Sequence, residues 1–366
     1  MSQTAIPFLF MRGGSSRGPY LSRADLPEDR ETLAEVLIAM IGAGHPLNID
    51  GIGGGAAVTT KVAMLSRSKD DWADIDYFFA QVSVEDRKVD FKPTCGNILV
   101  GVGPAAIEMG LIEPKDGATD VRIRAVNTGA RVSARIRTGL RGVTYEGDTA
   151  IDGVPGMAAP VDLQFMDVVG GATGTMFPTG SRIDRIDGVD VSCIDVAMPI
   201  VIARADAFGL TAHESVTELD ENRTFMERIE AMRRIAGEKM GMGDVSQSVI
   251  PKFAILGPAA NGGTASVRYF MPQRCHPTLA VTGAQCVSAC LLCPGTVSDG
   301  LVADIPASPA RLTLEHPTGT MDVTVDYRRD GDSFDLISAG LVRTARKLAA
   351  GDVFVPGSVW SGIELA

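Results

Sequence analysis

Alternating apolar and polar positions recur along the whole chain and predict β-strands. The clearest cases are residues 131–138 and 321–327, where every second side chain is apolar, as expected of a strand with one buried face. Further strand-like runs lie at 5–12, 76–84, 121–126, 161–168, 191–205, 252–257 and 266–271. The pattern therefore predicts a protein built mainly of half-buried, mostly antiparallel strands.

Two segments have the spacing of an amphipathic helix, with apolar residues three and four positions apart and one polar face. They are residues 24–42, which end at a glycine, and residues 221–241. Two others, 96–111 and 283–292, carry almost no charge, Glu108 being the only ionisable residue apart from cysteines. A helix that is apolar on every face belongs inside a core, so these two are predicted to be buried.

The two predicted buried helices lie one in each half of the chain, each between strand-like segments. A length of 366 residues also suggests two domains, at roughly 100–200 residues per domain. We therefore expect an α+β protein with two similar domains, residues 1–185 and 186–366, each a central buried helix wrapped by a mostly antiparallel sheet. The loop 181–190 is the expected boundary.

Composition and charge narrow the classes of function. Hydrophobic residues make up 45% and charged residues 22% of the chain, as in a soluble protein with a full core. The net charge of −11 argues against a nucleic-acid partner, although a local group of arginines still suits a small anion. No long apolar run or leader-like N-terminus points to a membrane. The six cysteines are scattered, as reduced thiols are, and a cytoplasmic location is expected.

The sequence TCGN places Cys95 directly before one of the predicted buried helices. The first N–H groups of a helix have no internal partner and carry partial positive charge, so they favour a thiolate and also bind carboxylates. Cys95, with Gly96 and Asn97 in the first turn, is therefore a candidate acid or base beside a carboxylate site. An inert core cysteine is the alternative interpretation.

The segment NIDGIGGGAAVTTKVAML (48–65) joins a glycine-rich loop to a lysine. Gly54 and its neighbours permit close approach of the backbone to a ligand. A dinucleotide-binding GxGxxA pattern is a weak alternative, because no strand precedes it. Lys61 opens an apolar strand-like run. A desolvated lysine there would have a lowered pKa and act as a base, whereas a solvated edge lysine is the simpler interpretation.

Two further segments are candidate anion sites. MRGGSSRG sets four polar residues on a glycine-rich turn, which suits a carboxylate or phosphate clamp but also an ordinary basic turn: Arg12, Ser15, Ser16 and Arg17. In the second half, Arg274 and His276 are candidate substrate ligands, and Gly283 to Cys286 is expected to stand where TCGN stands in the first half. Cys286, Cys290 and Cys293 share one helical face, but no clear fourth ligand accompanies them, so a metal site is not favoured.

Taken in order, these stretches resemble the 4-oxalomesaconate tautomerase and 2-methylaconitate isomerase family. The resemblance covers nearly the whole chain and rests on MRGGSSRG, IDGIGGGAAVTTKVA, CGNILVGVGPAAIEMGL, FPTG, GDVSQSVIPK, EHPTGTM and LVRTARKL. It implies the fold of diaminopimelate epimerase and proline racemase, with two pseudo-symmetric domains and an active-site cleft between them. It implies no cofactor and no metal, and we expect a homodimer.

The resemblance also implies the chemistry. The family's lysine and cysteine correspond to Lys61 and Cys95, whose roles as base and acid stay open, and substrate carboxylates would meet helix N-termini and the Arg12–Arg17 loop. The expected reaction is a 1,3-allylic proton shift in an unsaturated di- or tricarboxylate. The substrate of first choice is 4-oxalomesaconate, from aromatic acid breakdown; 2-methylaconitate and 3-methylitaconate are alternatives. With Cys286 as a candidate second thiol, a cysteine-based racemase or epimerase is a further alternative, and a catalytically silent binding protein is another.

Overall fold

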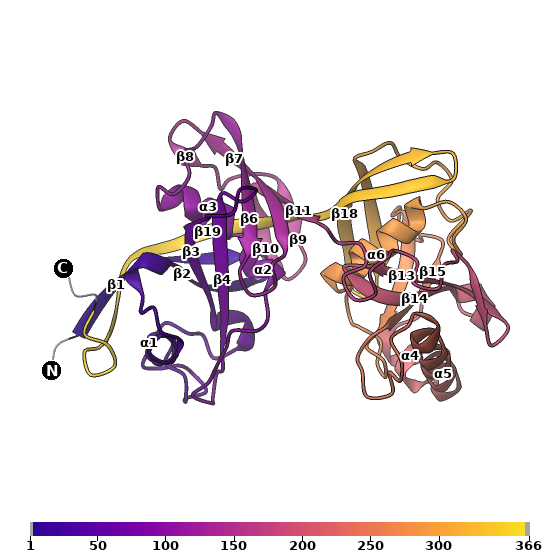
Figure 1. Ribbon diagram of the computed structural model, residues 1–366, viewed down its shortest axis with the longest axis horizontal. Helices are drawn as coiled ribbons and strands as arrows, with labels where there is room; N and C mark the ends of the chain where they lie inside the picture. Colours follow the sequence, from indigo (N-terminus) through magenta and orange to yellow (C-terminus); the bar gives the residue numbers. More distant parts are fainter. Residues whose placement is uncertain (1–2, 363–366) are drawn as a thin grey trace. The chain divides into compact units, whose positions relative to one another are not determined.

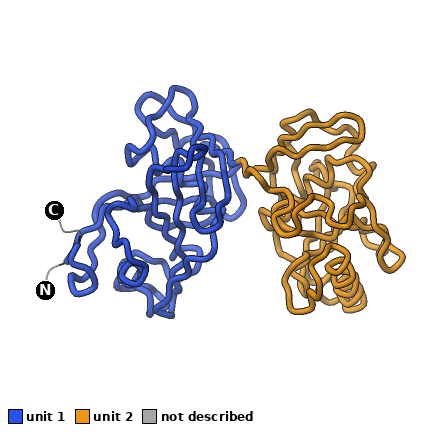
Figure 2. The backbone as a smooth tube through the Cα atoms, in the orientation of Figure 1, with its two compact units in different colours: residues 1–163, 342–366 blue, residues 164–341 orange. Residues whose placement is uncertain are grey.

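The computed structural model describes residues 3–362, which form two compact units. The first unit comprises residues 1–163 and 342–366, and the second comprises residues 164–341 (Figure 2). Each unit is a mixed α/β structure with few helices. Within the described residues, no helix is both long and apolar enough to span a membrane.

The last strand of the chain explains why the division differs from the one expected at residue 185. Strand β19 (Ser333–Pro356) begins in the second unit and then pairs antiparallel with β1 (Gln3–Gly13) of the first unit. Val353 and Val355 of β19 are buried in the same cluster as Ile6 of β1. The final segment therefore belongs with the N-terminal residues, and the loop 181–190 lies inside the second unit.

Strands of the first unit follow a fixed pattern of pairing (Figure 1). β1 pairs antiparallel with β2, β2 parallel with β3, β3 antiparallel with β4, β4 parallel with β6, and β6 antiparallel with β7. The elements are β2 (Ser16–Ser22), η1 (Arg23–Asp25), α1 (Arg30–Ile41), η2 (Ala57–Thr59), β3 (Lys61–Arg67), β4 (Ile75–Val82), β5 (Val89–Asp90), α2 (Gly96–Leu99), α3 (Val102–Glu108), β6 (Gly117–Ala125), β7 (Arg131–Gly139), β8 (Gly142–Val143), β9 (Thr149–Ile151) and β10 (Val154–Ala158). Strand β11 (Pro160–Met166) begins in the first unit and ends in the second.

Strands of the second unit repeat that pattern. β13 pairs antiparallel with β14, β14 parallel with β15, β15 antiparallel with β16, β16 parallel with β17, and β17 antiparallel with β18. The elements are β12 (Asp184–Ile186), β13 (Val189–Val196), β14 (Met198–Arg204), η3 (Ala205–Phe208), α4 (Val216–Glu221), α5 (Arg223–Lys239), β15 (Lys252–Gly257), β16 (Ala265–Phe270), α6 (Val281–Leu292), β17 (Ala310–His316) and β18 (Gly319–Asp330).

The four predicted helices all exist, with one change. α1 ends where Gly42 adopts a left-handed conformation with φ of 76°, and α5 covers the second amphipathic segment. α6 is buried along its length from Gly283 to Leu292 and packs in a cluster with residues of β14 and β18, as the absence of charge predicts. The segment 96–111 instead forms two short helices, α2 and α3, which meet at Gly101.

One predicted strand is in fact a hairpin. The apolar run 191–205 contains β13 and β14, which pair with each other on either side of Ala197. Ala197 has a φ of 58°, a left-handed conformation that is unusual for a residue with a side chain. Because alanine gives no turn signal in the sequence, the run predicts one continuous strand where the chain reverses.

Candidate active site

Cys95 lies directly before α2, as its position in TCGN predicts. It is the N-cap residue, with φ of −133° and ψ of 109°, and no side chain caps the first turn. Its thiol is partly exposed, while its carbonyl oxygen accepts hydrogen bonds from the Leu99 N–H at 2.9 Å and the Tyr77 hydroxyl at 3.4 Å. Burial and the neighbouring thiol of Cys95 raise the pKa of Tyr77, which therefore stays a protonated donor at this site.

Lys61 is the first residue of β3 and lies beside the part of β4 that contains Tyr77 and Phe79. Its Nζ is 5.5 Å from the centroid of the Phe79 ring, and no ion pair is recorded for its amino group within residues 3–362. Phe79 and Tyr77 are alternate residues of β4, so both face the same side of the sheet, with ring centroids 6.3 Å apart. Lys61 and Cys95 are thereby set against adjacent aromatic rings of one strand.

The turn between β1 and β2 is held against the start of α2. Asn97 donates from Nδ2 to Ser15 Oγ at 3.2 Å, and its Oδ1 accepts from the Ser15 N–H at 3.4 Å. Gly14 has a φ of 53°, and a Cβ there would lie 2.1 Å from Asn97 Oδ1, so only glycine fits. The buried hydroxyl of Ser16 has no hydrogen-bond partner among the described residues, which leaves a polar group free for a ligand.

The two arginines of this turn differ in their surroundings. Arg12 donates to the carbonyl oxygens of Gly14 at 2.8 Å and Thr344 at 2.7 Å and to Thr344 Oγ1 at 3.0 Å, so its guanidinium ties β1 to β19. Arg17 is exposed, with its guanidinium carbon 5.7 Å from the Phe10 ring centroid. A Cβ on Gly54 would lie 2.8 Å from Arg17 Nη2, which brings the glycine-rich loop next to this arginine. The geometry therefore favours Arg17 over Arg12 as an anion ligand.

Gly96 faces open space. A Cβ built on Gly96 meets no atom within 4 Å, whereas one built on Gly18 would lie 1.7 Å from the Lys61 carbonyl oxygen. Packing therefore explains Gly18 but not Gly96. The free volume beside Gly96 adjoins Cys95 at the start of α2, where a substrate would need room.

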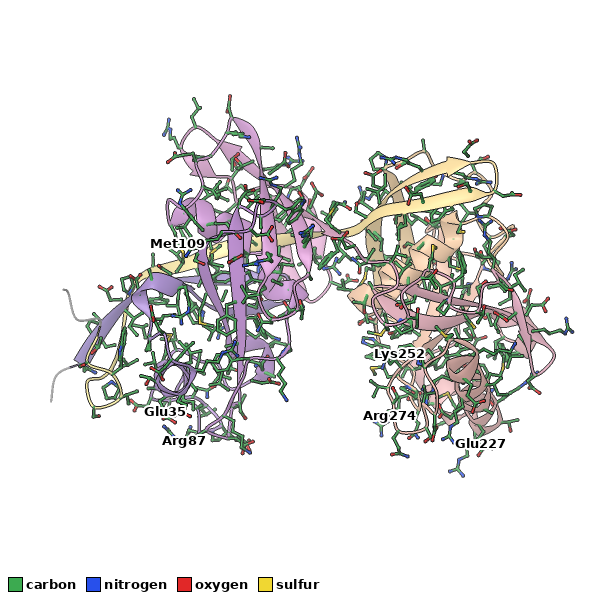
Figure 3. All side chains as sticks on the ribbon, viewed as in Figure 1. Glu35, Arg87, Met109, Glu227, Lys252 and Arg274 are labelled. Carbon is green, nitrogen blue, oxygen red and sulfur yellow. The ribbon has the colours of Figure 1, made fainter. Side chains whose placement is uncertain are left out.

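In the second unit, His276 and Arg274 follow β16 on a tight turn (Figure 3 labels Arg274). His276 Nδ1 accepts from the Thr278 N–H at 3.0 Å, so the neutral ring carries its proton on Nε2 and offers it as a donor. Burial lowers the pKa of His276, which favours that neutral form. The side chain of Arg274 is exposed. Gly283 is tightly packed, since a Cβ there would lie 2.6 Å from the ring of Tyr269.

Cys286 does not occupy the position expected of a second catalytic thiol. The residue that precedes α6 is Ala280, and Cys286 lies inside the helix, fully buried, with Sγ 3.6 Å from the Ile194 carbonyl oxygen. Burial raises the pKa of its thiol well above the usual range. The expected match of Gly283 to Cys286 with TCGN is therefore wrong. In the part of the chain that the structure describes, no three His, Cys, Asp or Glu side chains are grouped as metal ligands would be.

Sequence reasoning missed the aromatic side of this site. Tyr20, Tyr77 and Phe79 lie in apolar runs and read as ordinary core residues, yet Tyr20 donates to the Ile98 carbonyl at 2.5 Å and Tyr77 to that of Cys95. The available signal was the spacing of Tyr77 and Phe79 two residues apart, which places both rings on one face of a strand.

Comparison with known proteins gives the fold and the family. The crystal structure of methylitaconate-delta-isomerase has the same fold, with a TM-score of 0.89 and 30% identity over 100% of this chain and 99% of the other. The PrpF protein family model matches residues 3–356, and the chain belongs to that family.

Named relatives give the class of activity. The chain is 47% identical to the putative isomerase YbhH of Escherichia coli strain K12, over 96% of this chain and 99% of the relative. It is 42% identical to the 4-oxalomesaconate tautomerase of Pseudomonas putida, over the full length of both. The protein is an isomerase.

Proposed function

We propose that this isomerase catalyses a 1,3-allylic proton shift in an unsaturated di- or tricarboxylate, with 4-oxalomesaconate as the first substrate to test. The placement of Lys61 and Cys95 against adjacent rings of β4 carries the proposal, because such a shift needs one group to remove a proton and another to return one two atoms away. The 42% identity to a 4-oxalomesaconate tautomerase supports the choice of substrate.

The proton leaves a carbon next to a carboxylate or carbonyl group that is conjugated with the alkene. Its removal gives a dienolate, and protonation at the far carbon completes the shift with no net gain or loss of atoms. A neutral Lys61 amine suits the first step and the Cys95 thiol the second, with the reverse assignment as the alternative. Both carbons must lie within reach of these two groups, whichever acts first.

The dienolate carries negative charge on oxygen, and several groups near Cys95 suit it. The first N–H groups of α2 are uncapped by any side chain, the Ser16 hydroxyl is buried without a partner among the described residues, and Arg17 lies beside the glycine-rich loop. Fixed donors of this kind stabilise developing charge without having to reorganise. We assign the substrate's carboxylate and enolate oxygens to these groups.

The matching pairing order of the two units supports a further proposal, that they are pseudo-symmetric domains of the diaminopimelate epimerase type. Apart from η2 and β5, which only the first unit has in this series, the elements follow one order in both units: two strands, a 3-10 helix, a surface helical segment, two strands, a buried helical segment and two strands. A racemase with two opposed thiols is less well supported, because Ala280 stands where Cys95 stands in the first unit.

The reaction is tested by proton NMR in D₂O with the purified protein and 4-oxalomesaconate, and separately with 2-methylaconitate and 3-methylitaconate. We expect new vinyl or methylene signals, with deuterium at the shifted carbon, for one of the three. Exchange of a proton without movement of the double bond would favour the racemase alternative. No change in any of the three would refute the proposed reaction.

A further inference from the structure

Lys61 and Lys252 occupy the same place in the two units. Each is the first residue of the strand that pairs in parallel with the preceding hairpin, β3 in one unit and β15 in the other. The two strand pairs also share the same register. Four residues after each lysine, a leucine lies opposite the N-cap residue of the 3-10 helix: Leu65 opposite Ser22, and Leu256 opposite Arg204.

The two lysines also share a face of their sheets. Ala63, two residues after Lys61, pairs with Phe79, whose ring lies beneath the Lys61 amino group. In the second unit, Ala254, two residues after Lys252, pairs with Tyr269. Since alternate residues of a strand face the same side, Lys252 lies on the Tyr269 face of its sheet.

That face carries the start of α6 and His276. The Tyr269 ring lies against the first turn of α6, because a Cβ on Gly283 would be 2.6 Å from it, and its centroid is 6.1 Å from that of His276. Lys252 is close enough to His276 for its charge to lower the pKa of the imidazole. The lysine, the Nε2–H of His276 and the uncapped start of α6 therefore belong to one region of the second unit.

Lys252 has no acidic partner among the described residues, since its amino group makes no hydrogen bond or ion pair with any of them. The side chain is half-buried, and Figure 3 labels it. Burial and the positive charge of Arg233 lower the pKa of Lys252. Arg233 is itself 1% exposed and is paired with Glu230, with Nε 2.6 Å from Oε2. It also donates to the carbonyl oxygens of Ile250 and Pro251, so it fixes the chain that leads into Lys252.

Holding an ammonium group partly buried without an acidic partner costs free energy unless an anion offsets it. We propose that Lys252 is a substrate-binding lysine, the counterpart of Lys61, and that it binds one carboxylate of the substrate. His276 donates a second hydrogen bond to that carboxylate from Nε2. This inference rests on the proposed function for its choice of substrate, and on the second unit alone for its geometry.

The test compares the parent with K252M, which removes the charge but keeps the length, and K252R, which keeps the charge. K239M is the control, since Lys239 belongs to the same unit but lies on α5, with Nζ 3.5 Å from Asp184 Oδ1. Two quantities are measured: KM and kcat for the NMR-confirmed substrate, and the Kd of tricarballylate, a saturated tricarboxylate, by calorimetry. Circular dichroism and thermal unfolding check folding, and K252Q replaces K252M if K252M fails to fold.

We expect K252M to raise KM and the tricarballylate Kd by about 10- to 100-fold, as for the loss of a hydrogen bond to a charged group, with kcat less affected. K252R should recover most of the binding, and K239M should match the parent. Unchanged KM and Kd in a folded K252M would overturn the assignment of Lys252 and leave the proposed function intact. A parent that binds tricarballylate through Lys252 but isomerises nothing would refute only the proposed function. A parent that does neither would refute both.

Discussion

Gly18 and Gly96 allow the same substitution, glycine to alanine, to be compared in two different environments. A methyl group added at Gly96 would enter open space beside Cys95, whereas the same group at Gly18 would lie 1.7 Å from the Lys61 carbonyl oxygen. Side-chain carbons do not approach closer than 3.0 Å, so G18A requires β2 and β3 to separate by about 1.3 Å at Lys61. The neighbour is backbone, which does not move out of the way as a flexible side chain does.

The two substitutions should change the Tm in different directions. Overpacking of this kind costs about 1–3 kcal/mol, so G18A should lower the Tm by several degrees, at roughly 2–4 °C per kcal/mol for a unit of this size. G96A should unfold at the parent's temperature or slightly above it, since Gly to Ala at a compatible position adds about 0.4–1 kcal/mol. If the free volume belongs to the substrate, a methyl group there should lower kcat/KM by about 10- to 200-fold.

Thermal unfolding by circular dichroism and steady-state kinetics on the same preparations separate these effects. A G96A variant with the parent's kcat/KM would refute the idea that substrate occupies the space beside Gly96. A G18A variant with the parent's Tm would show that β2 and β3 separate at Lys61 at little cost, and would refute the expected destabilisation by the close contact.

Three further predictions concern single side chains. C95S should keep the parent's Tm but lower kcat by a factor of about 10² or more, measured by the NMR assay, and a fully active C95S would remove Cys95 from the mechanism. C286A should keep turnover while losing about 1–2 kcal/mol of unfolding free energy in urea, because the thiol is a buried packing group; loss of turnover in a folded C286A would revive the two-thiol alternative. E315Q should destabilise by about 2 kcal/mol at neutral pH, since Glu315 accepts from the N–H groups of Ala260, Asn261 and Gly263 and from Ser266. These bonds lower the pKa of Glu315 to about 2 from an ordinary 4.5, so its stabilisation is present above about pH 4.5 and is lost as the pH falls toward 2. The unfolding free energies of the parent and E315Q in urea should therefore converge on acidification. A difference in unfolding free energy that does not change with pH would contradict this.

Local signals predicted four helical segments and most of the strands, but not α4. α1 has apolar residues at helical spacing, an Asp29 side chain that caps its first turn and Gly42 at its end, all visible in the sequence. α6 was recognisable as buried because it lacks charge on every face. Strand β19 was not predicted at any point along its length. Over residues 346–352 its side chains are exposed and show no alternation of apolar and polar residues.

For the site, the sequence predicted the position of Cys95 before a helix, because the TCGN stretch itself marks that start. It did not predict that Tyr77 and Phe79 lie next to Cys95 and Lys61, since that contact depends on the pairing of β3 with β4. Nor did it predict that Lys252 matches Lys61, which became visible only from strand register. Contacts between distant segments are the part that composition and periodicity do not encode.

The pairing of β1 with β19 has a consequence for the order in which the chain is made. Gln3 lies opposite Pro356 and Gly13 opposite Ala345, so β1 leaves the ribosome well before the strand with which it pairs. The whole second unit is synthesised in between. During that interval, β1 presents an unpaired edge on the β19 side, the kind of surface to which other chains add strands. Loss of the chain from Ala345 onward would leave that edge open permanently, and a protein truncated there is expected to aggregate rather than to yield a smaller working enzyme.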